Sequence, residues 1–194
     1  LMESVKGKPE EYLVKMATLR SMSKAVYTTR NIGHFGLAFD FYTHFTSPIR
    51  RYPDLLIHRL IKAHAGGDPI TAQEMQAFDT LALHASEREV AASDAERDSI
   101  KMKQVEFLAG RIGEEFDAVI SGVTERGLYV EEQTTHADGM IRMKDVSDDY
   151  FEYEEKNYRL VGRRTKKVFR LGDPIRVRLT AARLAEKELD FIPA

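Results

Sequence analysis

The sequence has 194 residues, 43% of them hydrophobic and 31% charged, and its formal net charge is −2. That length suffices for one ordinary domain or two small ones, and the net charge excludes a bulk positive charge as the source of any affinity for nucleic acid. The absence of cysteine excludes disulfides and cysteine-based zinc sites. No apolar run approaches the roughly 20 residues of a membrane span, so we expect a cytoplasmic location and no membrane partner.

Residues 1–110 are predicted to be mainly helical. A first helix is expected to begin near Pro9, because proline loses no hydrogen bond in the first helical turn. A second is expected to begin with Ser47 as its N-cap and Pro48 at its first position. It should end near the Gly66-Gly67 pair.

A third helix is expected to begin at Thr71, since Glu74 stands at the spacing of a capping box. It continues toward Leu108, either unbroken or with a break near residues 91–94. Between the first two helices, residues 35–45 alternate aromatic and small side chains, which indicates strand-like or extended backbone.

Residues 111–194 have a different pattern, and the boundary is predicted near residues 110–113. Short runs that alternate apolar and polar side chains are separated by turn signals, which is typical of a small closed barrel. The predicted strands are residues 116–123, 128–130, 139–141, 175–179 and 188–192. The expected fold class is therefore α+β, with a helical part followed by a five-stranded OB-fold barrel.

One segment combines a helix start, adjacent arginines and several aromatic rings: His44-Phe-Thr-Ser-Pro-Ile-Arg-Arg-Tyr-Pro-Asp54. A cation in the first helical turn is disfavoured by about 0.3–1 kcal/mol. An arginine there gains from a nearby anion, and a phosphate suits both a guanidinium and a helix start. The residues alone leave two alternatives open, namely surface ion pairs for the arginines and a packed core for the aromatics.

This segment and the upstream His34-Phe-Gly-Leu-Ala38 together resemble the closing signature of the catalytic domain in the ribonuclease II and ribonuclease R family. The resemblance implies a processive 3′-to-5′ exoribonuclease that hydrolyses single-stranded RNA to nucleoside 5′-monophosphates. It implies that Arg50 acts at the scissile phosphate. It implies weaker roles for Arg51 and Tyr52, in contacting the RNA backbone or in supporting the site.

The resemblance also implies Mg²⁺ in the full-length enzyme, held by a cluster of aspartates. That cluster lies in an earlier part of the catalytic domain, and nothing before Thr46 resembles it, so we expect no metal bound by this chain. His34, His44 and His58 lack a usual ligand spacing and are expected to have structural or RNA-adjacent roles. The chain alone should therefore bind RNA without hydrolysing it, because two-metal cleavage needs several converging carboxylates.

The barrel segment resembles the RNA-binding OB-fold of the ribosomal S-one type, from Gly113 to Glu131, over residues 138–143 and again from Leu171 to Leu179. Such barrels bind single strands by aromatic stacking and a basic groove. Tyr129 keeps one of the two usual aromatics, Arg126 replaces the other, and Arg142 stands where histidine is common. Together with Lys144, these residues are the expected RNA-binding residues, the alternative being that Tyr129 simply packs on the barrel surface.

The segment between the third and fourth predicted strands is acidic over residues 145–155 and basic over residues 159–170. One interpretation is mutual pairing across a hairpin, which we favour for Arg159. The other is a basic rim over an RNA entrance, formed by some of residues 163–167.

Three functions are compatible with the sequence of the whole chain. The first is a fragment of an exoribonuclease, whose partners would be single-stranded RNA and the missing earlier part of the catalytic domain. Its exposed interface could also drive self-association. The others are a stand-alone RNA-binding adaptor and a translation factor that uses the barrel alone. The segment from His34 to Asp54 favours the enzyme, because a binding module has no need of an arginine in that setting.

Overall fold

The computed structural model describes residues 2–7, 11–67 and 69–194. The chain divides into two compact units, one formed by the segments up to Met22 and from Arg97 onward, the other by residues 23–96. The expected helix start at Pro9 lies outside the described residues. The first helices of the chain are α1 (Met2–Val5) and α2 (Glu11–Ser21). No helix within the described residues is both long and apolar enough to cross a membrane.

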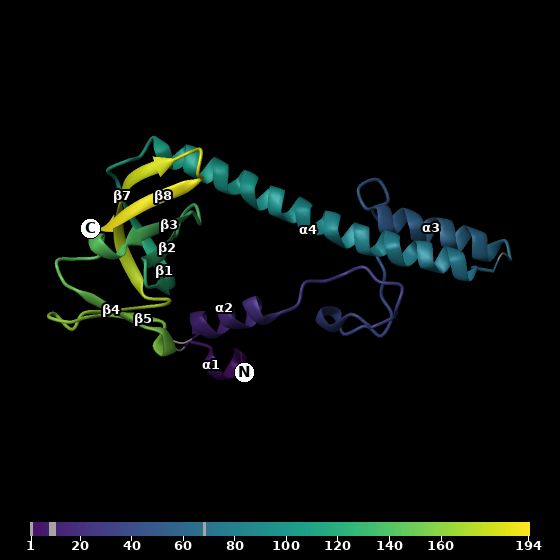
Figure 1. Cartoon of the computed structure of the whole chain (residues 1–194), viewed down its shortest axis with the longest axis horizontal. Helices are drawn as coiled ribbons and strands as arrows, with labels where there is room; N and C mark the ends of the chain where they lie inside the picture. The colour runs from purple at the N-terminus through teal and green to yellow at the C-terminus, as the bar shows by residue number, and fades with distance from the viewer. Residues whose placement is uncertain (1, 8–10, 68) are drawn as a thin grey trace. The chain divides into compact units, whose positions relative to one another are not determined.

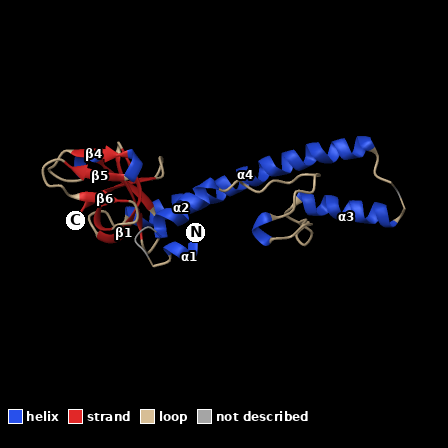
Figure 2. Ribbon diagram, turned by 90° about the horizontal axis from the view of Figure 1, so that it is seen from below, coloured by secondary structure: helices blue, strands red, loops and turns tan. Residues whose placement is uncertain are grey.

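In the 23–96 unit, irregular backbone precedes helix α3 (Tyr52–Ala65). It contains a short 3-10 turn, η1 (Phe35–Leu37), and an isolated bridge between His34 and Phe39. The extended segment expected there is thus a series of turns with one bridged pair. Helix α3 and the first part of the following helix run beside each other in both views (Figures 1 and 2).

The expected start of the second helix at Ser47 is wrong. Residues 48–50 form a turn, and α3 begins only after Arg51, whose backbone is extended at φ −125° and ψ 110°. Pro53 explains the delay, because proline has no N–H to donate and its ring would clash with the carbonyl four residues earlier in a continuous helix. Arg50 and Arg51 therefore precede the helix instead of occupying its first turn.

Helix α4 (Ala72–Ala109) is one continuous helix of 38 residues. Its predicted capping box is present, since Thr71 N donates to Glu74 Oε2 at 2.8 Å and Glu74 N donates to Thr71 Oγ1 at 3.2 Å. Residues 91–94 are helical, which excludes the alternative with a break. They include two alanines and neither glycine nor proline, so local propensity favours continuation.

The five-stranded barrel is confirmed, and it is closed in the order β1-β2-β3-β8-β7 (Figure 1). Strands β3 and β8 pair in parallel, and the other neighbours are antiparallel. Apolar side chains alternate into one core, as the period of two predicted. The strands are β1 (Glu115–Thr124), β2 (Gly127–Glu132), β3 (Asp138–Arg142), β7 (Pro174–Arg183) and β8 (Glu188–Pro193).

Between β3 and β7 the chain adds a second sheet in the order β4-β5-β6 (Figure 2). Phe151, Leu160 and Phe169 bury their side chains in the same core as the barrel. The expected hairpin pairing is confirmed for Arg159, whose Nε lies 2.8 Å from Glu154 Oε2. The elements of this insertion are η2 (Met143–Asp145), β4 (Phe151–Glu154), η3 (Glu155–Asn157), β5 (Arg159–Gly162) and β6 (Val168–Arg170).

Candidate functional site

The turn that carries Arg50 is tied to helix α3 by Asp54. Asp54 is fully buried, and its Oδ2 accepts hydrogen bonds from Ser47 N at 2.7 Å and from Arg51 Nη2 and Nε at 2.8 and 3.2 Å. The Ser47 carbonyl accepts in turn from the N–H groups of Arg50 and Arg51, at 3.2 and 2.9 Å. Both ends of the turn are therefore held to the first turn of the helix.

The carboxyl of Asp54 is ionised at neutral pH. Burial alone would raise its pKa, but the hydrogen bond from Ser47 and the bonds and positive charge of Arg51 outweigh burial, so its pKa lies below the ordinary value. The second oxygen, Oδ1, is buried and has no hydrogen-bond partner among the described residues. Such an orphan acceptor is costly unless a further donor reaches it.

Arg50 and Arg51 differ in what they can do. The Arg51 side chain is only 17% exposed and is engaged by Asp54. Arg50 is exposed and forms no ion pair with any described residue, so its guanidinium is open to an external anion. Tyr52 is 47% exposed at the start of α3. The structure thus shows a supporting contact for Arg51, while RNA contact by Arg51 and Tyr52 stays a prediction.

The aromatic and aliphatic side chains before α3 do not form a buried core. Phe35, Phe41 and Ile49 are 97%, 81% and 101% exposed. Among the described residues of the 23–96 unit, Asp54 is the one side chain that is fully buried. The packed-core alternative therefore fails for the aromatics Phe35 and Phe41, and together with Ile49 they leave an apolar surface open to a further partner.

The three histidines each have a local partner. His34 Nδ1 accepts from Leu37 N at 3.1 Å, and His58 Nε2 lies 2.8 Å from the carbonyl oxygen of Phe45. His44 Nδ1 lies 3.0 Å from the Tyr27 hydroxyl. No three histidine, aspartate or glutamate side chains converge as a metal site anywhere in the part of the chain that the structure describes.

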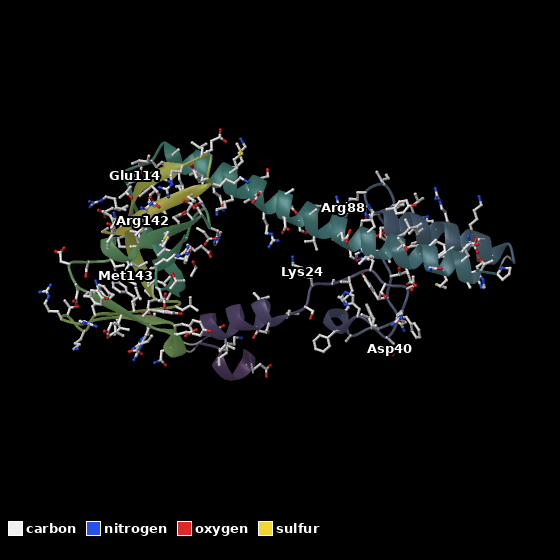
Figure 3. All side chains as sticks on the ribbon, viewed as in Figure 1. Lys24, Asp40, Arg88, Glu114, Arg142 and Met143 are labelled. Carbon is white, nitrogen blue, oxygen red and sulfur yellow. The ribbon has the colours of Figure 1, made fainter. Side chains whose placement is uncertain are left out.

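Four predicted residues of the barrel lie together where β2 and β3 meet the β1–β2 turn. Arg126 is in that turn, and its carbonyl accepts from Met143 N at 2.9 Å. Met143 lies between Arg142 and Lys144 in the chain, and Figure 3 labels Met143 beside Arg142. Tyr129 lies on β2 two residues after Gly127, which pairs with Arg142 of β3. Arg126 and Lys144 are exposed and form no ion pair with any described residue.

Tyr129 lies on the outer face of β2, 40% exposed, against a glycine on β1. A Cβ added to Gly122 would lie 3.3 Å from Cβ and Cδ2 of Tyr129, so the absence of a side chain there makes room for the ring. The ring is thus partly packed and partly available for stacking.

Arg142 is held by an acidic residue that the sequence reading did not identify. Asp190 Oδ2 lies 3.1 Å from Arg142 Nη2 and also binds Arg183. Chiefly because of the hydrogen bonds from Arg183, the pKa of Asp190 lies below its ordinary value. The Arg142 side chain remains 50% exposed, so Asp190 fixes the guanidinium while leaving part of it open to solvent.

Two family models match the chain, the RNB domain at residues 1–67 and the S1 RNA binding domain at residues 111–191. The chain is 42% identical to Ribonuclease R of Aquifex aeolicus over 192 residues and 37% identical to Ribonuclease R of Escherichia coli over 201 residues. The chain belongs to the ribonuclease R family. It aligns over 98% of its own length with both relatives but spans only 27% and 25% of theirs.

Solved structures of the ribonuclease R family have the same fold. The apo form of Mycoplasma genitalium RNase R matches with a TM-score of 0.88 and 30% identity, over 100% of this chain and 31% of that one. The same protein in complex with ribose methylated single-stranded RNA matches with a TM-score of 0.87. The Dss1 exoribonuclease of Candida glabrata, at 18% identity and a TM-score of 0.71, shares the fold alone.

Among the described residues of this ribonuclease R family chain, no set of side chains fits a magnesium site. Magnesium is usually bound through one or two carboxylates and several waters, whereas Oδ2 of Asp54, beside the Arg50 turn, already accepts hydrogen bonds from Ser47 and Arg51. Asp40 is exposed, and it belongs to no group of three ligand side chains in the described residues.

Proposed function

We propose that the chain is the phosphate-holding, C-terminal part of a processive 3′-to-5′ exoribonuclease that hydrolyses single-stranded RNA to nucleoside 5′-monophosphates. In this proposal Arg50 binds the scissile phosphate and stabilises the negative charge that builds up in the transition state. The observation that carries the proposal is an exposed, unpaired arginine on a turn whose two ends are fixed by a buried carboxylate.

The geometry supports a role in phosphate binding because a cation stabilises a transition state best when its position is already fixed before the reaction begins. Asp54 and Arg51 neutralise each other, so Arg50 keeps its full charge for a ligand. Ser47 contributes its amide to Asp54 and its carbonyl to the turn, and therefore positions the arginine without contacting the phosphate.

The metal ions of the reaction are proposed to be Mg²⁺ held by the part of the enzyme that precedes this chain. When bound there, magnesium would activate the attacking water and stabilise the leaving oxygen. The present chain contributes the arginine and the RNA-binding surface, and we expect it to be inactive on its own.

The barrel is proposed to hold the RNA strand on the surface that carries Tyr129, Arg126, Arg142 and Lys144. Tyr129 would stack on a base, an interaction worth about 1–3 kcal/mol. The three cations would contact phosphates or lie flat on a base, as guanidinium groups can. The solved complexes of Mycoplasma genitalium RNase R with ribose methylated single-stranded RNA and with double-stranded RNA support RNA as the ligand class.

The other proposed partner is the earlier part of the catalytic domain, which would cover the exposed apolar residues before α3. In its absence the same surface would favour self-association of the chain. A cytoplasmic location is proposed as well, and the lack of cysteine agrees with a reducing compartment.

A chimera tests the enzymatic proposal. Residues 1–194 replace the aligned quarter of Aquifex aeolicus Ribonuclease R, and shortening of a 5′-labelled single-stranded RNA is followed with Mg²⁺. We expect the chimera to degrade the RNA stepwise. Arg50→Ala should lower its rate by about 10²–10³, the effect of losing one preorganised donor to developing charge.

Arg50→Lys should restore little of the rate, because an ammonium cannot bind a phosphate in a bidentate way. Arg59→Ala is the matched control, since Arg59 is also exposed and lies on helix α3. Equal rates for Arg50→Ala and Arg59→Ala would contradict the role of Arg50. Degradation of RNA by the isolated chain at the rate of the chimera would contradict the division of the active site.

A further inference from the structure

The turn between β5 and β6, residues 163–167, carries more positive charge than its neighbours neutralise. Two acidic residues of β4 each form an ion pair with one arginine. Glu152 Oε1 lies 2.5 Å from Arg163 Nη2, and Glu154 pairs with Arg159. The remaining cations of the turn are exposed and form no ion pair with any described residue. They are Arg164, Lys166 and Lys167.

The backbone of this turn is held by Asp149. Its Oδ2 accepts from Thr165 N at 2.7 Å and from the Thr165 hydroxyl at 2.6 Å, and its Oδ1 accepts from Arg164 N at 3.1 Å. Gly162 allows this approach, since a Cβ there would lie 2.5 Å from Asp149 Oδ2. The carboxylate therefore binds backbone groups and offsets one positive charge at most.

The side chains of Arg164 and Lys167, on either side of the segment that Asp149 holds, contact groups that carry no charge. Arg164 Nη2 donates to the carbonyl of Asp148 at 3.1 Å, and Lys167 Nζ lies 4.8 Å from the centre of the Phe169 ring. Neither contact neutralises the cation. With Asp149 counted, the turn keeps a surplus of positive charge on a rigid backbone.

Lys166 adds a second, independent observation. Its φ is +56°, a left-handed conformation that glycine adopts without cost and that is unfavourable for a side chain with a Cβ. The lysine side chain therefore disfavours the backbone conformation in which it is found. Glycine at this position would therefore remove the charge without straining the turn.

We propose that residues 164–167 form a second RNA-binding site, which contacts the phosphate backbone of a single strand through Arg164, Lys166 and Lys167. This inference rests on the proposed RNA-binding function of the barrel and extends it to the insertion. The shared core of barrel and insertion holds the site in a fixed position relative to Tyr129. A protein partner is less suited, since interface cores need apolar surface that three cations do not supply.

Salt dependence of RNA binding by the full chain tests this site. The variant Arg164→Gln, Lys166→Gly, Lys167→Gln is compared with wild type on a short labelled oligouridylate. Each lost phosphate contact on a single strand reduces the slope of log K against log salt by about 0.7. We therefore expect a slope that is smaller by about 2 and weaker binding at low salt. The control Arg159→Gln, Arg176→Gln, Arg178→Gln removes three cations that are ion-paired in the structure and should leave the slope near that of wild type.

Lys166→Gly alone separates folding from binding. It removes a charge and also relieves the backbone, so the thermal midpoint should not fall while RNA affinity does. An unchanged slope in the triple variant, with wild-type binding intact, would overturn this site and leave the barrel proposal standing. A wild-type chain that does not bind oligouridylate would overturn both. Equal losses in the control variant, or binding of polyglutamate but not RNA through the same three residues, would also overturn the site.

Discussion

At the scale of single residues, the carboxylate of Asp54 joins a turn to a helix. It is buried and accepts three hydrogen bonds, one from Ser47 and two from Arg51. A buried pair of this kind adds little net stability when formed, but removing one partner leaves the other charge uncompensated. Asp54 therefore controls whether Arg50 is presented in one conformation.

Asp54→Asn should lower the free energy of unfolding of the helical unit by about 3 kcal/mol at neutral pH, because Arg51 loses its counter-charge in a buried setting. Because the pKa of Asp54 is lowered in the folded state, its contribution is present above the unfolded pKa of about 3.9. It is lost as the pH falls through the folded pKa. The difference between wild type and variant should thus shrink below about pH 4.

Urea unfolding followed by far-ultraviolet circular dichroism measures both effects. Asp40→Asn provides the control, since Asp40 is exposed on the same unit, and it should change stability by no more than about 0.5 kcal/mol. A constant difference between wild type and Asp54→Asn down to strongly acid pH would show that the charge of Asp54 is not what holds the turn.

At the scale of elements, the barrel depends on close approach between strands β3 and β8. Gly139 on β3 has no room for a side chain, because a Cβ there would lie 2.3 Å from the ring of Phe191 and 2.9 Å from the carbonyl oxygen of Leu189. Phe191 is itself buried in the core, so neither neighbour can move freely. This glycine is where the parallel pair closes the barrel.

Gly139→Ala should therefore lower the free energy of unfolding of the barrel by about 2–3 kcal/mol, the cost of overpacking a well-filled core. Tyrosine fluorescence during urea unfolding is a suitable signal, since the chain contains no tryptophan. Gly110→Ala is the matched control, because a Cβ at Gly110 meets nothing within 4 Å. Equal stability of the two variants would mean that strands β3 and β8 can move apart to admit a side chain at Gly139 without loss of stability.

The start of α3 shows why element boundaries were harder to predict than elements. Ser47-Pro48 has the composition of a helix start, and so has the later segment that contains Pro53. Both prolines suit the first turn of a helix. The helix begins at the second one because the ring of Pro53 would clash with the preceding turn if the helix had begun at Pro48. The capping box at Thr71 was predictable because its two hydrogen bonds lie within four residues.

At the scale of the whole molecule, the two units differ in how they bury apolar surface. The core of fully buried hydrophobic side chains comprises residues of the barrel, the insertion and the end of α4. The described residues of the 23–96 unit contribute none to it. The exposed residues Phe35, Phe41 and Ile49 are therefore free to contact another chain.

We expect the isolated chain to associate with itself in a concentration-dependent way, because exposed apolar patches are rarely left uncovered. Sedimentation velocity of the variant Phe35→Ser, Phe41→Ser, Ile49→Ser should show a shift toward monomer. The control Ile100→Ser, Tyr150→Ser, Leu184→Ser removes exposed apolar side chains from the other unit and should leave association unchanged. A wild-type chain that remains monomeric at all concentrations would contradict this expectation.

The sequence by itself determined the elements whose signals are local. Alternation with a period of two identified all five barrel strands, and side chains three residues apart identified the cap of α4. The three strands of the insertion, β4, β5 and β6, were not among the predicted strands. Arg50 was selected by resemblance to a family signature, whereas its free charge depends on Arg51 being engaged by Asp54.

Only the tertiary structure decided which charges remain available. The guanidinium of Arg142 binds Asp190 across 48 positions of sequence, whereas Asp149 binds the backbone N–H of Arg164 across 15 and leaves that guanidinium without an ion pair among the described residues. No local pattern encodes such pairs, because the folding of the sheets brings them together. The physical reason is that periodicity reports which face of an element a side chain occupies, while the partner it meets there depends on how distant strands pair.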